Sequence, residues 1–291
     1  MLNSWLELDG VADAAAAVSD HAGLDLVRLG TTAGADEIKD TAVTQPLVVA
    51  AALLAARTVP LPPGAIIAGH SVGELAAAAL AGVLTAWDAV DIAAVRGAAM
   101  SAACALTPTG MSAVMGGAVD DVLAALQELD LVGANVNGGG QIVAAGPLSA
   151  LAELAANPPG GVRVMPLPVA GAFHTSFMAS AESALEERLA AVVPHNPVHP
   201  LLTNSDGSVV TSGAAYLTLL GAQVTKPVRW DACMRTMRAM GVTGVLELPP
   251  AGALVGLVKR DLKGVATMAL KTPADLDGAL AFVGEHAGVL L

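Results

Sequence analysis

Hydrophobic positions along the chain group into short runs of strand type and longer runs of helix type. The run 65–68 (Ala-Ile-Ile-Ala) predicts a buried strand, whereas the runs 46–57 and 87–105 have the length and alanine content of helices. Pro46 is suited to the first turn of the former helix, and Thr85 is placed to cap the latter. This alternation of strands and helices predicts an α/β fold with a largely parallel sheet.

The pattern changes between residues 110 and 168, where strands outnumber helices. In chain order, the predicted strands are 111–115, 131–136, 141–145 and 162–167, and the predicted helices are 120–129 and 148–156. The resulting order β-α-β-β-α-β is that of a ferredoxin-like subdomain. We therefore expect a small subdomain over 110–168, inserted into a large α/β core formed by 1–109 and 169–291.

Composition limits the classes of protein to be considered. The 291 residues are 54% hydrophobic, enough for one large core and a subdomain. The longest apolar run, 46–56, is well short of the roughly 18 residues of a membrane span, and the first residues lack the pattern of an export signal. Cys104 and Cys233 have no metal-site spacing, which fits a reducing compartment. We expect a cytoplasmic enzyme with no membrane association and no structural zinc.

The charge of the chain bears on its partners. A net charge of −12 argues against binding to nucleic acid. Basic residues nevertheless gather in two clusters, Lys226, Arg229, Arg235 and Arg238 in the first and Lys259, Arg260 and Lys263 in the second. These clusters are either a local positive rim for an acidic partner or ordinary solvated helix faces, and the sequence leaves both interpretations open.

The stretch 69–74 (Gly-His-Ser-Val-Gly-Glu) follows the predicted strand directly and places Ser71 between two glycines. A serine on such a strand-to-helix turn projects its hydroxyl from the end of a sheet, while the next helix aims its free N–H groups at the same point. This is the geometry of a nucleophile in acyl transfer. The alternative is a tight turn with a capping serine.

Five motifs together resemble the malonyl-CoA:acyl carrier protein transacylases, the acyltransferase family of fatty-acid and polyketide synthesis, and the actinobacterial members above all. They are 69–74, Arg96-Gly97 with Met100, 135–146 ending in Gln-Ile-Val-Ala-Ala-Gly, 171–174 (Gly-Ala-Phe-His) and 247–252 (Glu-Leu-Pro-Pro-Ala-Gly). The resemblance covers nearly the whole chain, and it implies an α/β-hydrolase-like core with a ferredoxin-like subdomain.

The resemblance implies a catalytic dyad. Ser71 would be the nucleophile and His174 the base that takes its proton. In the family a backbone carbonyl near the Pro-Pro segment, here 249–250, orients the imidazole, and the Val72 N–H would donate to the oxyanion. The implied reaction is ping-pong: malonyl-CoA acylates the serine, and the phosphopantetheine thiol of acyl carrier protein then collects the malonyl group. No metal or bound cofactor is required.

Substrate selection is expected from four further residues. Arg96 would hold the free carboxylate of the malonyl group by two parallel hydrogen bonds; its alanine-rich flanks suit a buried helix, although most arginines lie on surfaces. Phe173 beside His174 resembles the malonyl-selective form of the family's motif, in which a bulky ring leaves no room for a methyl group on the α carbon. Asn137 and Gln141, in the glycine-rich hairpin, would contact substrate or carrier, or would simply form the turn.

Two other functions remain open at this point. One is a serine esterase or thioesterase, which also uses Gly-x-Ser-x-Gly but releases its acyl group to water. The other is a noncatalytic acyl-carrier-binding protein, because the family's first strand and the following Gly-Gln-Gly segment have no counterpart in this chain. We expect Met1 to be an internal methionine, with the missing strand encoded upstream in the same frame. The sequence does not decide between a fatty-acid and a polyketide carrier.

Overall fold

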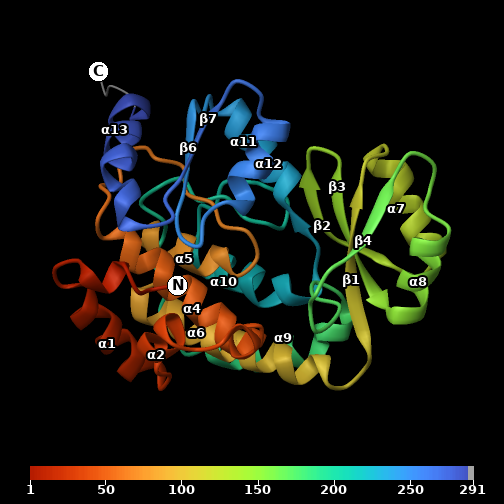
Figure 1. The fold of residues 1–291 in the computed structure, drawn as a ribbon, viewed down its shortest axis with the longest axis horizontal. Helices are drawn as coiled ribbons and strands as arrows, with labels where there is room; N and C mark the ends of the chain where they lie inside the picture. Colours follow the sequence, from red (N-terminus) through yellow and green to blue (C-terminus); the bar gives the residue numbers. More distant parts are fainter. Residues whose placement is uncertain (288–291) are drawn as a thin grey trace.

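The computed structural model describes residues 1–287, which form a mixed α/β fold (Figure 1). Helices dominate the larger part of the molecule, and parallel strand pairs lie among them. In chain order these helices are α1 (Val11–Ala22), α2 (Leu26–Thr31), α3 (Ala35–Ile38), α4 (Thr41–Ala56), α5 (Gly73–Leu80), α6 (Ala86–Cys104), α9 (Ala179–Leu189), α10 (Gly213–Ala222), α11 (Trp230–Ala239), α12 (Ala253–Asp261) and α13 (Leu276–His286). None of the helices within 1–287 is both long and apolar enough to cross a membrane.

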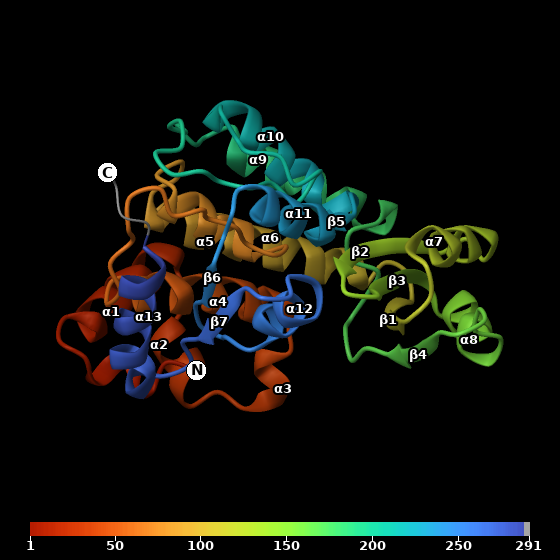
Figure 2. The ribbon, with the colours of Figure 1, turned by 90° about the horizontal axis from the view of Figure 1, so that it is seen from above.

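A small sheet projects from one side of the helical part, and two helices cover one of its faces (Figures 1 and 2). Its elements are β1 (Thr109–Met115), α7 (Val119–Glu128), β2 (Val132–Gly138), β3 (Gln141–Pro147), α8 (Leu148–Ala156) and β4 (Arg163–Pro166). The strand order is β4-β1-β3-β2-β5, and the first four strands pair antiparallel. The short β5 (Val228–Arg229) joins β2 in parallel, so a later part of the chain extends this sheet.

The small sheet has its own apolar core. Leu126 of α7 and Leu154 of α8 are fully buried against Val114, Val136 and Ile142 of the strands. The β2–β3 hairpin turns through three glycines that all have positive φ, 71°, 56° and 74° at residues 138, 139 and 140. Such values favour glycine because a side chain would collide with the backbone. The glycine-rich hairpin therefore places the ends of β2 and β3 at a fixed position beside the larger part.

Parallel pairing in the larger part is less extensive than the sequence pattern predicts. Within the described residues it consists of β6 (Gly244–Glu247) with β7 (Ala266–Ala269) and a single bridge between Ile67 and Leu201. The predicted strand 65–68 thus contributes one bridged residue. The turn at Ser71 and Val72 begins three residues after that stretch ends and leads into α5.

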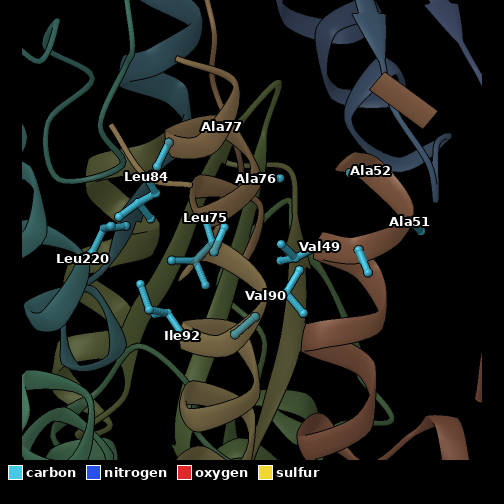
Figure 3. Close-up of a cluster of buried hydrophobic side chains, with 14 of the residues drawn as sticks. Val49, Ala51, Ala52, Leu75, Ala76, Ala77, Leu84, Val90, Ile92 and Leu220 are labelled. Carbon is cyan, nitrogen blue, oxygen red and sulfur yellow. The ribbon is translucent and has the colours of Figure 1, made fainter. Parts of the chain in front are cut away.

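Alanine-rich helices form the main core. Figure 3 shows side chains of α4, α5 and α6 meeting, among them Val49, Leu75 and Ile92, with Leu220 of α10 beside them. Gly97 of α6 permits the closest approach, since a Cβ there would lie 2.4 Å from the Thr41 carbonyl oxygen of α4. Alanine and glycine therefore bring α4 and α6 together along their length.

Helix α4 begins earlier than predicted. It runs from Thr41, five residues before Pro46, because the Asp40 carboxylate accepts the Ala42 N–H at 2.9 Å and caps the helix there. Pro46 therefore lies inside the helix and not in its first turn. The additional turn matters for the site because it carries Gln45. By contrast, α6 begins as predicted: Thr85 caps it by accepting the Asp88 N–H at 3.0 Å.

Candidate active site

The turn that carries Ser71 is tight and strained. Ser71 has a φ of 53°, in the left-handed region that non-glycine residues seldom adopt. Position 69 accommodates only glycine, because a Cβ there would lie 2.1 Å from the Gly73 carbonyl. The side chain of Asn204 holds the turn at both ends: its Oδ1 accepts the Ser71 N–H at 2.7 Å, and its Nδ2 donates to the Gly69 carbonyl at 2.7 Å. The serine hydroxyl is thereby fixed just ahead of α5.

Ser71 and His174 form the pair that the sequence predicts. The Ser71 Oγ lies 2.7 Å from His174 Nε2, and His174 is buried with a φ of 61°. His174 Nδ1 lies 2.8 Å from the backbone carbonyl oxygen of Gln223. A carbonyl only accepts, so Nδ1 carries the ring proton and Nε2 presents its lone pair to the serine hydroxyl. That is the tautomer a general base requires.

The carbonyl that orients His174 was expected near the Pro-Pro segment, 249–250. It belongs instead to Gln223, which directly follows α10. The stretch 247–252 has a different role. The Glu247 carboxylate accepts the N–H groups of Gly252, Leu254 and Val255 at 3.0, 3.0 and 2.9 Å, which caps the N-terminus of α12. The motif therefore builds a helix end and does not contact the imidazole.

Electrostatics keep His174 neutral. Burial, and next the positive charge of Arg96, lower the pKa of His174 to about 3. A neutral imidazole at physiological pH is free to accept the serine proton. The same residues that exclude water from the ring therefore also prepare it as a base.

Arg96 lies on α6 with only 3% of its surface exposed, and its guanidinium contacts neutral oxygens alone. Nη1 donates to Gln45 Oε1 at 2.5 Å, and Nη2 donates to Gln223 Oε1 at 2.8 Å and to Ser71 Oγ at 3.1 Å. No carboxylate oxygen of residues 1–287 comes within 4.0 Å of it. Burial lowers the pKa of Arg96 to about 10, so it remains a cation at neutral pH. A buried cation beside the nucleophile is thus available to an anionic group.

The other predicted site residues lie around Ser71 and His174 at different distances. Val72 immediately precedes α5, and its N–H has no hydrogen-bond partner in the described part of the chain. Phe173 is half-buried next to His174 and packs against the cores of both parts of the molecule. Asn137 is buried, and its Oδ1 lies 2.8 Å from His70 Nε2; its Nδ2 donates to Gln141 Oε1 at 3.3 Å. Asn137 and Gln141 therefore reach the nucleophile turn through His70.

Sequence reasoning missed the residues that support the site. Gln45, Asn204 and Gln223 are isolated amides in helices or loops, and no spacing pattern marks them. Glu74 does stand in the serine motif, but nothing in the sequence indicates that it is buried among polar groups contributed by α10 and the 203–205 segment. Long-range packing alone brings these side chains together.

The two basic clusters differ in whether their side chains are paired with other groups of the protein or exposed to solvent. Arg229 and Arg235 both pair with Asp231, at 2.9 and 2.6 Å, and the Arg238 guanidinium donates to the Asp261 carbonyl. Lys259, Arg260 and Lys263 are exposed at the end of α12. A Cβ on Gly139 would lie 3.0 Å from the Arg260 Cβ, so this second cluster adjoins the β2–β3 hairpin.

A strained serine, a neutral histidine and a buried arginine gather around one hydroxyl, which is the set of groups that acyl transfer through a serine requires. Comparison with known proteins agrees: the chain belongs to the acyl transferase domain family, whose pattern matches residues 6–278. It is 55% identical to a malonyl CoA-acyl carrier protein transacylase of Mycobacterium bovis over 282 residues, 95% of this chain and 93% of that protein.

Solved structures show the same relationship. The crystal structure of MCAT from Mycobacterium tuberculosis matches with a TM-score of 0.92 and 55% identity, covering 96% of this chain and 94% of the other. A malonyl-transacylase in complex with its type II PKS acyl-carrier protein matches with a TM-score of 0.89 and 28% identity, covering 97% and 94%. The family is thus the one that the sequence motifs predict, and the mixed α/β fold agrees with the predicted fold class.

Proposed function

We propose that this protein transfers the malonyl group from malonyl-CoA to the phosphopantetheine thiol of acyl carrier protein, supplying extender units for fatty-acid biosynthesis. The observation that carries the proposal is the position of Arg96. Its buried guanidinium donates to the Ser71 hydroxyl at 3.1 Å and has no carboxylate partner within residues 1–287. An acyl group that carries its own carboxylate supplies that partner.

The reaction proceeds in two half-reactions at one serine. Ser71 Oγ attacks the thioester carbonyl while its proton passes to His174 Nε2; the C–S bond then breaks as the ester forms, and the CoA sulfur takes that proton from His174 and leaves as the thiol. The Val72 N–H stabilises the oxyanion at the N-terminus of α5. In the second half-reaction the carrier thiol loses its proton to His174 and attacks the ester carbonyl; the C–O bond to Ser71 breaks, and His174 returns the proton to Ser71 Oγ, which regenerates the serine hydroxyl. These side chains suffice for the chemistry without a bound cofactor.

Selection among acyl groups rests on two side chains. The Arg96 guanidinium binds the malonyl carboxylate, which an acetyl group lacks. Phe173, packed beside His174, occupies the space that a methyl group on the α carbon needs. Asn137 and Gln141 line the approach from the hairpin side, where they contact the substrate or the carrier.

The carrier docks, in this proposal, beside the glycine-rich hairpin. Lys259, Arg260 and Lys263 are exposed there on a chain whose net charge is −12, and carrier proteins are acidic. Arg229 and Arg235 contribute less, because both pair with Asp231, whose single negative charge offsets one of their two positive charges. We place the reaction in the cytoplasm, in keeping with two unpaired cysteines, Cys104 and Cys233.

We assign the architecture as an α/β-hydrolase-like core, 1–109 and 169–291, with a ferredoxin-like subdomain over 110–168. The strand order β4-β1-β3-β2 and the two helices on one face support the second part of this assignment. The strand β5 then adds a segment of the large core to the edge of the small sheet.

Intact-mass measurement tests the proposed function. Mixing the protein with malonyl-CoA should add the mass of one malonyl group, and adding holo acyl carrier protein should move that mass to the carrier. The Ser71→Ala variant should acquire no adduct, and an adduct on it would remove Ser71 as the nucleophile. Release of free malonate without a carrier would indicate a thioesterase, and no adduct on the wild-type chain would indicate a noncatalytic carrier-binding protein.

A further inference from the structure

Glu74 is the buried acid of the site that the proposed mechanism does not use. It lies in the first turn of α5 with 2% of its surface exposed. Its Oε1 accepts the Asn204 N–H at 2.8 Å and the Tyr216 hydroxyl at 3.0 Å, and its Oε2 accepts a hydrogen bond from Gln223 Nε2. The carboxylate of Glu74 makes no hydrogen bond to Ser71, His174 or Arg96 within residues 1–287; only its backbone N–H reaches Ser71, whose carbonyl it meets at 3.0 Å. Its hydrogen-bonded connection to Arg96 therefore runs through Gln223.

The hydrogen bonds around Gln223 admit one orientation of its amide. A guanidinium has only donors, so the amide oxygen must face Arg96 Nη2, at 2.8 Å. The amide nitrogen then faces two acceptors, the Glu74 carboxylate and the Ser71 carbonyl, the latter at 3.2 Å. Without an acceptor at the Glu74 position, the nitrogen would keep only the neutral Ser71 carbonyl, at 3.2 Å, and would lose its charged partner.

We propose that Glu74 is a positioning residue for malonyl selection: its carboxylate fixes the side-chain amide of Gln223, and that amide fixes the guanidinium of Arg96. The proposal rests on the proposed function, because it assigns to Arg96 the recognition of the malonyl carboxylate. The two carboxylate oxygens of Glu74 have different roles in this proposal. Oε2 leads to the site, whereas Oε1 binds the backbone of Asn204 and the hydroxyl of Tyr216 and holds the fold.

A glutamine at position 74 would not replace the carboxylate. An ionised carboxylate accepts at both oxygens, and the backbone N–H of Asn204 and the Gln223 amide nitrogen can only donate. A glutamine has one accepting oxygen, so its NH₂ group would face a donor on one side or the other. Arg96 would keep its bond to Gln45 but would lose its fixed partner at Nη2.

The experiment compares malonyl-CoA with acetyl-CoA as the acyl donor at pH 8, in single-turnover acylation of the wild type, Glu74→Gln, Gln223→Ala and the double variant. We expect Glu74→Gln to slow malonylation about 10- to 100-fold, the range for one hydrogen bond to a charged group, and to slow acetylation much less. Because Glu74 acts through Gln223, the double variant should be no slower with malonyl-CoA than Gln223→Ala alone.

The matched control is Tyr216→Phe, which removes one donor from Glu74 Oε1 and leaves the Oε2 bond in place. It should lower the Tm and leave the ratio of malonyl to acetyl rates unchanged. Circular dichroism shows which variants fold. If Glu74→Gln does not fold, Glu74→Asp takes its place, since it keeps the charge but draws the carboxylate away from Gln223; a smaller loss, again selective for malonyl, is expected.

Three results would overturn the proposal: an unchanged malonyl rate in Glu74→Gln, equal losses with both acyl donors, or losses that add fully in the double variant. Each would reduce Glu74 to a residue that only supports the fold. Failure of the proposed function is a separate result, because it shows in the wild-type protein, which would then form no malonyl adduct at all.

Discussion

Arg96 Nη2 donates to Ser71 Oγ at 3.1 Å, so the nucleophile and the buried cation are in direct contact before any substrate binds. The serine hydroxyl accepts from Arg96 and donates to His174, and both of its hydrogen-bonding directions are therefore used. The contact favours an alkoxide developing on Ser71. Burial, and next the charge of Arg96, lower the pKa of His174. One positive charge thus lies beside both the nucleophile and the base.

Replacing Arg96 should change selectivity more than reactivity. In Arg96→Ala we expect malonyl transfer to fall at least about 10-fold, because the malonyl carboxylate loses its charged partner, and acetyl transfer to stay constant or rise. Steady-state kinetics with both CoA esters measure this. Arg96→Lys is the informative companion, since an ammonium keeps the charge but not the two parallel bonds. Equal losses for both acyl groups in Arg96→Ala would make Arg96 a structural residue.

Removing the base should affect both half-reactions. In His174→Ala we expect acylation by malonyl-CoA and transfer to the carrier each to slow by at least about 10²-fold, the usual contribution of a positioned general base. His21→Ala is a control, because His21 is exposed. Rapid-quench kinetics resolve the two steps. Transfer at a near-normal rate would exclude the dyad, and slowing of one step alone would restrict His174 to that step.

Charge reversal near the hairpin should weaken carrier binding. Arg260→Glu should raise the KM for acyl carrier protein about two- to fivefold at low salt, the effect of one exposed ion pair, and leave the KM for malonyl-CoA nearly unchanged. Arg163→Glu is the matched control: Arg163 is exposed on β4, at the opposite edge of the sheet from β5. Added salt should reduce the difference between the variants. Identical carrier kinetics for both would show that docking lies elsewhere.

The sequence predicts local elements well where residues that cap or end helices are present. The predicted helix 148–156 has the same bounds as α8, and Thr85 caps α6 as expected. The start of α4 was wrong because Asp40, and not Pro46, sets it. The extent of the parallel sheet was also overestimated, since pairing depends on neighbours far away in the chain.

The site divides in the same way, into residues that local motifs reveal and groups that only long-range packing brings in. Ser71, Val72 and Arg96 stand in motifs, and the structure brings Ser71, His174 and Arg96 within hydrogen-bonding distance. The carbonyl of Gln223 could not be found from the sequence, because a backbone group carries no residue signature. Asn137 was expected to contact substrate or carrier; the structure bonds it to His70, which ties the hairpin to the residue before the nucleophile.

The ionisation of Glu74 should make the free energy of unfolding depend measurably on pH. Burial raises its pKa to about 7, above the ordinary 4.5. Between these two pH values the folded chain holds a proton that the unfolded chain has released, so the free energy of unfolding falls as pH rises. Above pH 7 the loss is complete and is on the order of 3 kcal/mol. Glu74→Gln cannot ionise and should lack this loss.

The difference in unfolding free energy between the wild type and Glu74→Gln isolates this effect. The charged and titratable groups around Glu74 do not titrate in that window, because Arg96 has a pKa of about 10, Cys233 about 12 and Tyr216 well above 10. The titration of His174 is common to both proteins and cancels. Urea unfolding at pH 5, 6, 7 and 8 should show the difference moving in favour of glutamine as pH rises. Parallel curves, with a constant offset, would mean that Glu74 keeps an ordinary pKa.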